Sequence, residues 1–128
     1  MNTSEIRPAS VPASALLSTW TEHDWRDGLK LDELSALDRV IAHTCYSTYE
    51  IIVVSPSTGE ILVRGGQFFP EFAPARLAGA SLGGSLLKMR SMYVGFRIEL
   101  ALDGRVIITS PVRTLAVEPA SVRAGELM

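Results

Sequence analysis

The glycine-rich segment Gly79–Lys88 contains the residues whose types and spacing come closest to a known chemical motif. Its first five residues, Gly79-Ala80-Ser81-Leu82-Gly83, match the G-x-S-x-G turn that presents a nucleophilic serine in hydrolases. That turn needs a large parallel sheet and a histidine that follows the serine in the chain. This chain is short, and both His23 and His43 precede Ser81. The match therefore does not predict catalysis.

The same segment can be compared with a phosphate-binding loop. A nucleotide P-loop places lysine directly after its last glycine, whereas Gly84 is followed by Ser85 and Lys88 comes later. Consecutive glycines can still turn their N–H groups toward an anion, and neighbouring bases would add charge. The alternative is a tight turn at a sheet corner where another backbone segment passes closely. The candidate ligand-binding residues are Phe68, Phe69, Arg76, Ser81, Gly83, Gly84, Ser85, Lys88 and Arg90.

Three of the four phenylalanines, Phe68, Phe69 and Phe72, lie just before this segment. They can close one open end of the fold. Alternatively, they can form a stacking surface for a base or another ligand, or part of a protein interface.

His43 and Cys45 would share one face of a strand, where a thiolate–imidazole pair could act as a nucleophile. No acid other than Asp38 stands near to orient the pair, and a cysteine on an apolar strand is more often a small buried residue. A single cysteine excludes an internal disulfide. One cysteine and two histidines also cannot form a structural zinc site of four cysteines or of two cysteines and two histidines. We expect no enzymatic activity, no metal and no cofactor.

The chain has 128 residues, enough for one domain, and 47% of them are hydrophobic. Its net charge of -2 excludes a histone-like or a polyelectrolyte composition. The charge is unevenly divided: residues 1–38 carry seven acids and three bases, whereas residues 39–117 carry eight bases and five acids. An acidic head therefore precedes a mildly basic body.

The first twelve residues are rich in serine and proline, which is typical of a flexible tail. Helical spacing of apolar residues then predicts one amphipathic helix from about Ala13 to Trp25. Its candidate interface residues are Leu16, Trp20 and Trp25, which would dock on the body or on a second copy of the chain. We find no signal peptide and no run long enough to span a membrane. With one lone cysteine, this predicts a cytoplasmic protein.

From Arg39 onward the pattern is that of strands. Residues 48–64 predict a hairpin around the turn cluster 55–59, and Glu71–Leu77 is compatible with a short helical turn. Residues 92–102 alternate as one long strand, and Asp103-Gly104 predicts a type I′ turn into a returning strand at 105–109. Pro111 marks an edge or a break before a last strand at 112–117.

Five or six short antiparallel strands cannot bury both faces of an open sheet. We therefore predict a mainly β fold, a small five- to six-stranded antiparallel barrel that is SH3-like or related and follows a short N-terminal helix. The predicted organisation is an acidic tail and helix over residues 1–34, the barrel over 35–118 and a C-terminal tail over 119–128.

Two loop patterns in the body, Gly65-Gly66-Gln67-Phe68-Phe69 and Ser81-Leu82-Gly83-Gly84-Ser85-Leu86-Leu87-Lys88, carry a family resemblance. The chain resembles a family of small uncharacterised bacterial β-barrel proteins with a G-G-x-F-F loop and an S-x-G-G-S-x-x-K loop. The resemblance covers roughly residues 38–117. It implies a bacterial, all-β domain in which the two glycine loops form one recurring element, and it assigns no activity.

These observations predict a non-enzymatic binding or interaction module that self-associates or binds a protein or peptide. The alternative is nucleic-acid, anion or phosphate-ligand binding through the basic body and its glycine-rich loop. Residues 76–113 hold six bases and two acids, a modest excess compared with dedicated nucleic-acid binders.

Overall fold

The structure is a computed structural model that describes residues 28–83 and 86–120. In these ranges the chain forms ten strands and one short 3-10 helix. They are β1 (Gly28–Lys30), η2 (Leu31–Glu33), β2 (Arg39–Thr44), β3 (Thr48–Ser55), β4 (Glu60–Gly65), β5 (Phe69–Ser81), β6 (Leu87–Met89), β7 (Ser91–Tyr93), β8 (Arg97–Leu102), β9 (Arg105–Ile108) and β10 (Val112–Glu118). Every strand pairing is antiparallel. The predicted mainly β, antiparallel class is confirmed.

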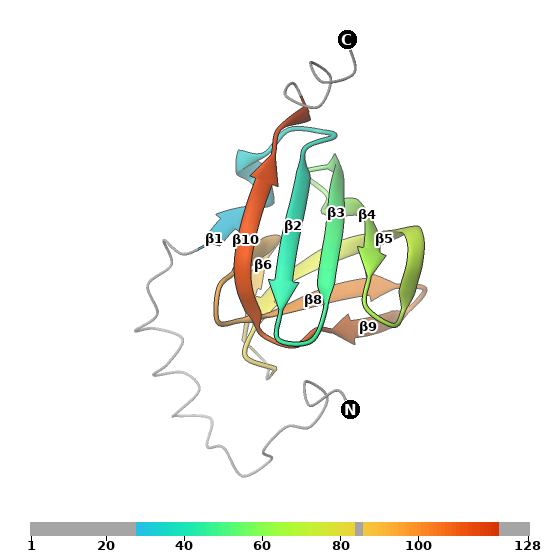
Figure 1. The fold of residues 1–128 in the computed structure, drawn as a ribbon. Coiled ribbons are helices and arrows are strands. Elements are labelled where there is room, and N and C mark those ends of the chain that lie inside the picture. The colour runs from blue at the N-terminus through green and yellow to red at the C-terminus, as the bar shows by residue number, and fades with distance from the viewer. Residues whose placement is uncertain (1–27, 84–85, 121–128) are drawn as a thin grey trace.

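One strongly curved sheet makes up most of the domain. Its strands follow the order β10-β2-β3-β4-β5-β8-β9, with β6 paired to β5, and β1 and β7 form a separate two-stranded sheet. In Figure 1, β10, β2 and β3 run along the front while β8 and β9 cross behind them. Aliphatic and aromatic side chains from both halves fill the space between, among them the fully buried Val40, Ile51, Val63 and Leu100.

The sheet is not the closed barrel of five or six strands that the sequence predicts. Across the described ranges, no ladder joins β9 to β10, the two ends of the strand order. Thr109–Pro111 connect these ends, and Pro111 has no N–H for a ladder. The Val112 N–H instead donates to the Phe96 carbonyl at 2.8 Å, and the Gly95 N–H donates to the Val112 carbonyl at 2.8 Å. This pair of bonds joins the start of β10 to the turn between β7 and β8, and not to β9.

Both hairpins predicted from turn chemistry are confirmed. β3 and β4 pair around the turn at residues 56–59, and β8 and β9 pair across Asp103-Gly104. Asp103 and Gly104 have φ values of 49° and 75°, the two positive values that a type I′ turn needs.

The long connection after Phe68 is strand rather than loop, and the helical turn predicted for Glu71–Leu77 is wrong. β5 pairs first with β4 and then, beyond Arg76, with β8. Ala73, Ala75 and Leu77 pack on the core at every second position, which is strand spacing. At Gly79, with φ 151°, an added Cβ would overlap the Lys88 carbonyl of β6. A glycine is needed there because another backbone segment passes closely.

The single strand predicted over residues 92–102 is divided. A turn at Val94–Phe96 separates β7 from β8, with Gly95 at φ 91° and the Phe96 N–H donating to the Tyr93 carbonyl at 3.1 Å. Alternation continues within β8, where Ile98 and Leu100 are buried. Residues before and after the turn consequently contribute to two different sheets.

The described chain begins against this β7 segment. Gly28 pairs with Tyr93, and Leu31 of η2 is fully buried in the core. The helix predicted over Ala13–Trp25, with its candidate interface residues Leu16, Trp20 and Trp25, lies outside the described residues. No helix in residues 28–83 and 86–120 is both long and apolar enough to cross a membrane.

Candidate binding surface

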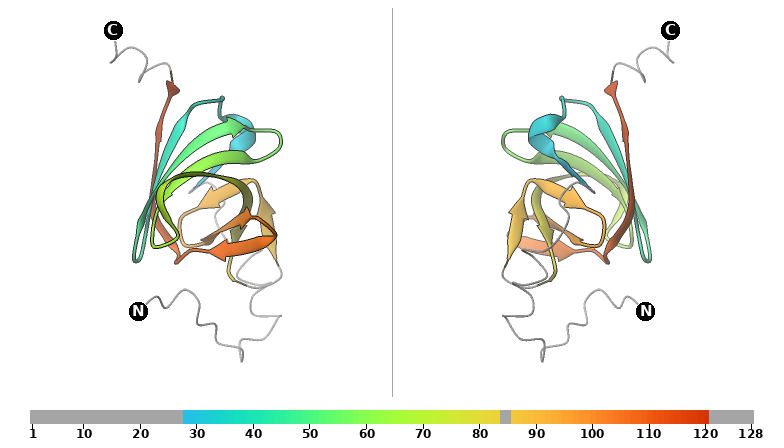
Figure 2. Two further views of the ribbon diagram at one scale, coloured as in Figure 1. Left: turned by 90° about the vertical axis from the view of Figure 1, so that its right-hand side faces the viewer. Right: turned by 90° about the vertical axis from the view of Figure 1, so that its left-hand side faces the viewer.

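A hollow of about 360 Å³ opens at one end of the curved sheet. We call it the aromatic hollow. Three chain segments line it, namely the β2–β3 turn, the β4–β5 turn and the edge strand β9. The lining residues are Tyr46, Ser47, Tyr49, Gln67, Phe68, Ile107 and Ile108. Figure 2 shows both turns reaching the same end of the molecule as β9. The site is thus assembled from residues far apart in the sequence.

Hydrogen bonds hold the β2–β3 turn so that it projects from the sheet. The Thr44 N–H donates to the Ser47 carbonyl at 2.8 Å, and the Ser47 N–H donates to the Thr44 hydroxyl at 3.1 Å. The Ser110 hydroxyl donates to the same Thr44 hydroxyl at 2.8 Å and ties the turn to the connection between β9 and β10. Tyr46 therefore leaves the sheet on a fixed turn and stays 55% exposed.

Tyr49 forms the floor of the aromatic hollow and is only 6% exposed. Burial raises the pKa of its phenol, and a hydrogen bond with Ser47 partly offsets that rise. The β4–β5 turn crosses directly over the ring. A Cβ added to Gly66, whose φ is 61°, would lie 2.5 Å from the Tyr49 phenol oxygen. Glycine at this position lets the turn approach the ring and place Phe68 at the rim, where it is 48% exposed.

The remaining wall of the hollow is a sheet edge. β9 pairs only with β8 among the described strands. In a two-residue hairpin the pair that closes the turn, here Leu102 and Arg105, exchanges both main-chain hydrogen bonds. By alternation, Ile107 also bonds to β8, while Val106 and Ile108 direct their N–H and C=O groups away from it. Val106 is 58% exposed, so this edge is open to a further strand.

Every side chain that lines the aromatic hollow is uncharged. Two exposed aromatic rings, two isoleucines and three polar groups face one another there. Such a surface can receive an apolar or aromatic side chain, with the Gln67 amide at its wall to donate or accept a hydrogen bond. It offers no charge to a phosphate.

The three phenylalanines of the sequence motif point to three different places. Phe69 is 2% exposed in the core, Phe68 lines the aromatic hollow, and Phe72 lies under Arg64, whose guanidinium carbon is 4.3 Å from the ring centroid. The prediction that they act together, as a plug or as one stacking surface, is wrong. Neighbouring residues of a strand face opposite sides, so Phe68 and Phe69 separate as β5 begins.

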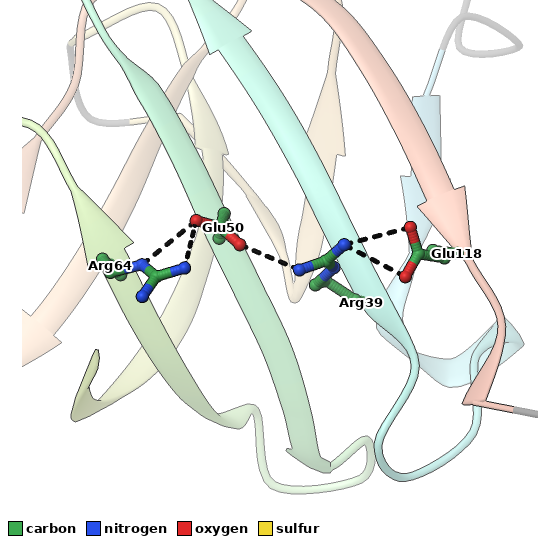
Figure 3. A network of polar contacts seen from close by, with 4 residues as sticks. All are labelled: Arg39, Glu50, Arg64 and Glu118. Carbon is green, nitrogen blue, oxygen red and sulfur yellow. Dashed lines mark hydrogen bonds and ion pairs between the residues drawn. The ribbon is translucent and has the colours of Figure 1, made fainter. Parts of the chain in front are cut away.

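Arg64 also begins a ladder of alternating charges on the outer face of four strands. Glu50 accepts from Arg64 at 2.6 Å and from Arg39 at 3.0 Å, and Arg39 donates in turn to Glu118 at 3.0 Å (Figure 3). These side chains pair with one another across β4, β3, β2 and β10, although the buried Arg39 Nε has no hydrogen-bond partner. The charge ladder is therefore a structural feature of the sheet.

Ser81, the serine of the apparent hydrolase motif, is fully buried. Its hydroxyl donates to a Glu99 carboxylate oxygen at 2.5 Å and accepts the Gly83 N–H at 3.1 Å. A buried hydroxyl bound at both sides cannot reach a substrate. The Gly83 N–H is likewise used within the chain, and Gly84 and Ser85 lie outside the described residues.

The basic candidates of the sequence converge in part, because a Cβ added to Gly59 would lie 3.2 Å from the Arg76 Cγ and 3.5 Å from the Arg90 Cγ. Arg90 donates to Asp32 at 3.3 Å and Lys88 is half-buried on β6. Arg76 lines a separate, shallow hollow of about 650 Å³ together with Glu60, Asp103 and Arg105, which balance its charge. Because Gly84 and Ser85 are not among the described residues, the anion site as a whole stays a prediction.

His43 and Cys45 do not form a catalytic pair. The His43 Nδ1 lies within hydrogen-bonding distance, 2.9 Å, of the Thr48 hydroxyl, and Cys45 comes after the end of β2 and is exposed. The expectation of a buried cysteine is wrong because the turn carries it out of the sheet. Asp38 accepts the N–H groups of Ser35 and Ala120, at 2.8 and 2.9 Å. The described ranges contain no cluster of three or more His, Cys, Asp or Glu side chains that could hold a metal.

Sequence reasoning identified Phe68 but missed Tyr46, Gln67, Ile107 and Ile108. The sequence does contain one signal for Ile107 and Ile108. Pro111 follows their short apolar strand and marks it as an edge strand, and an apolar edge strand is a candidate binding surface. That Tyr46 meets this edge follows from the closing curvature of the sheet, which no local pattern encodes.

Comparison of the chain with protein-family models, with curated proteins and with solved structures finds no match in any of the three.

Proposed function

We propose that this protein is a non-enzymatic binding module that captures an extended, uncharged segment of a partner protein. The segment adds to the free edge of β9 as a further antiparallel strand and places an apolar side chain in the aromatic hollow. The observation that carries this proposal is the coincidence of an open strand edge with an uncharged hollow along that same edge.

The dimensions suit a short segment. The four residues of β9 span roughly 13 Å at about 3.3 Å per residue, so four or five partner residues would pair with them. Ile107 faces the core side of the sheet, where it packs against the core. A partner side chain on that face would therefore lie beside Tyr46 and Phe68. Main-chain bonds supply affinity in this mode, and the hollow supplies selectivity.

Self-association, which the sequence also predicts, fits this edge less well. The turns that carry Tyr46 and Phe68 flank the hollow and leave room for a single strand beside β9. The edge of the incoming strand that faces away from β9 must therefore carry no further strand. The β9 of a second copy is attached to its own β8 and would bring that strand and its own flanking turns with it. An isolated tail or linker segment meets the geometric requirement better.

The alternative of nucleic-acid or anion binding has weaker support. Arg97 is 8% exposed with its guanidinium on the Thr109 carbonyl at 3.2 Å, and Arg90 is paired with Asp32. Arg76 and Arg105 share one hollow with Glu60 and Asp103, so the charged side chains of that surface carry no net positive charge to attract a polyanion.

A bacterial and cytoplasmic origin and an SH3-like relationship remain sequence-based parts of the proposal. The exposed free thiol of Cys45 supports a reducing compartment, since such thiols oxidise outside it. The curved antiparallel sheet supports kinship with small barrels at the level of architecture alone.

The proposal is tested by selecting short peptides on the immobilised full-length protein and measuring their affinity for defined variants. Val106→Pro removes an edge N–H that is not part of the β8 ladder, so the fold should persist while strand addition is blocked. Val106→Thr is the matched control, because it trims the same exposed side chain and keeps the N–H. Phe68→Ser tests the hollow without touching the edge. Peptides that bind all four proteins equally would refute the proposal.

A further inference from the structure

A second hollow, of about 310 Å³, lies on the other side of the domain from β9, beside edge strand β10. We call it the apolar flank. Apart from Gly28, its lining side chains are all aliphatic, and none of them carries a polar atom. They are Leu29 of β1, Val94 of the β7–β8 turn, and Leu115 and Val117 of β10. Val117 is 41% exposed, which leaves a branched aliphatic side chain open at the centre of an apolar surface.

The apolar flank lies where the described chain begins. Gly28 is one of its lining residues, and Figure 1 shows β1 beside β10. Gly28 is held in place because it pairs with Tyr93 in the ladder between β1 and β7. The preceding segment, residues 1–27, therefore starts from a fixed point at the rim of this hollow.

That segment carries the residue types that an aliphatic hollow selects. Both tryptophans of the chain, Trp20 and Trp25, belong to it, together with Leu16 and Leu17 at helical spacing. Trp25 precedes Gly28 by three residues, a reach of about 10 Å at most. A hollow of this volume has room for one indole ring.

We propose that residues 13–25 cover the apolar flank of their own chain, with the Trp25 ring against Val117 and Leu115. A second copy of the chain could offer the same side chains. However, a tether of three residues gives Trp25 an effective concentration in the millimolar range or above. Intramolecular cover is therefore favoured, and it leaves the aromatic hollow on the other side free for a partner. The proposal is independent of the proposed function.

Tryptophan fluorescence of the full chain reads out this contact selectively, since residues 28–128 contain no tryptophan. The native protein should show blue-shifted emission and several-fold weaker acrylamide quenching than the same protein in denaturant. Both should be unchanged on dilution from micromolar to nanomolar concentration. Equal acrylamide quenching in buffer and in denaturant would overturn the proposal. A blue shift that is lost on dilution would also overturn it, because a second copy of the chain would then supply the segment that covers the apolar flank.

Val117→Glu should raise acrylamide quenching toward the denatured value, because a carboxylate would then face the indole. The matched control is Val54→Glu, the same change at a valine of β3 with 45% exposure. This control should leave the quenching unchanged. Equal effects of the two substitutions would contradict the proposal. If the Val117→Glu variant does not fold, the acrylamide quenching of the native and the denatured wild-type protein still tests whether the tryptophans are covered. Peptide binding at β9 should survive Val117→Glu, which separates the two proposals.

Discussion

Replacing Gly66 with alanine should strain the contact between the β4–β5 turn and the Tyr49 ring. Gly104 in the β8–β9 turn provides a matched control. Both glycines have positive φ, 61° and 75°, but a Cβ on Gly104 has nothing within 4 Å, whereas one on Gly66 would lie 2.5 Å from the Tyr49 oxygen. The two variants therefore share the backbone penalty and differ in the steric one.

The magnitudes follow from those two penalties. Left-handed backbone costs an alanine roughly 1–2 kcal/mol, which is the whole expected loss of unfolding free energy for Gly104→Ala. Gly66→Ala adds an overpacking cost of about 1–3 kcal/mol as the phenol is displaced. Tyr49→Phe removes the overlapping oxygen, so it should recover part of the loss in the Gly66→Ala background.

Urea denaturation of five proteins, followed by far-ultraviolet circular dichroism, measures these differences as shifts in midpoint at constant slope. They are the wild type, Gly104→Ala, Gly66→Ala, Tyr49→Phe and the double variant Gly66→Ala/Tyr49→Phe. Non-additivity between Gly66→Ala and Tyr49→Phe would report the contact directly. If Gly66→Ala proves no more destabilising than Gly104→Ala, the turn does not lie against Tyr49 and the described floor of the aromatic hollow is wrong.

Two further outcomes follow from the electrostatics. Because burial raises the pKa of Tyr49, this phenol ionises at a lower pH in the unfolded chain than in the folded one. The free energy of unfolding should therefore fall as the pH rises past about 10, and Tyr49→Phe should lessen that fall. Spectrophotometric tyrosine titration with parallel urea melts checks this, and identical alkaline profiles would contradict it. Glu50→Gln removes the negative charge from both of its ion pairs and leaves one acceptor oxygen for two arginines. It should cost about 0.5–2 kcal/mol of unfolding free energy at low salt and less in molar salt, measured by the same melts. The control is Glu60→Gln, which changes a carboxylate that accepts one exposed hydrogen bond from Thr58. If Glu50→Gln lowers the free energy of unfolding by the same amount as Glu60→Gln, and independently of salt, the charge ladder contributes nothing to stability.

The parts of the fold that sequence predicts here are those fixed by local chemistry. Asp103-Gly104 specifies its own turn, and the alternation of Tyr49, Ile51 and Val53 specifies which side of β3 is buried. In both cases the deciding residues are neighbours along the chain.

Long-range pairing explains what sequence reasoning missed. β5 contains Pro70 and Pro74 and was compatible with a helical turn, but β4 and β8 hold it extended by pairing with its two halves in succession. The break at Gly95 likewise arises because the Phe96 carbonyl accepts the Val112 N–H, from a residue beyond the next hairpin. Apolar alternation alone does not reveal such a partner.

The residues of the candidate site also fall into those that local sequence marks and those that only long-range pairing brings together. The sequence marks Phe68 because three of the four phenylalanines cluster beside the glycine-rich segment, but the same cluster includes Phe69, whose ring is buried in the core. Ile107 meets Tyr46 only after the sheet has curved through several strands. A site assembled by curvature has no signature in any one segment.

The proposed function requires that β9 accept a partner strand beside the aromatic hollow. The most direct measurement is the affinity, by fluorescence anisotropy, of a selected labelled peptide for wild-type protein, Val106→Pro and Val106→Thr. We predict a loss of about tenfold or more for Val106→Pro, equivalent to about 1.4 kcal/mol, and little change for Val106→Thr. Equal affinity of the two variants would contradict the proposed function.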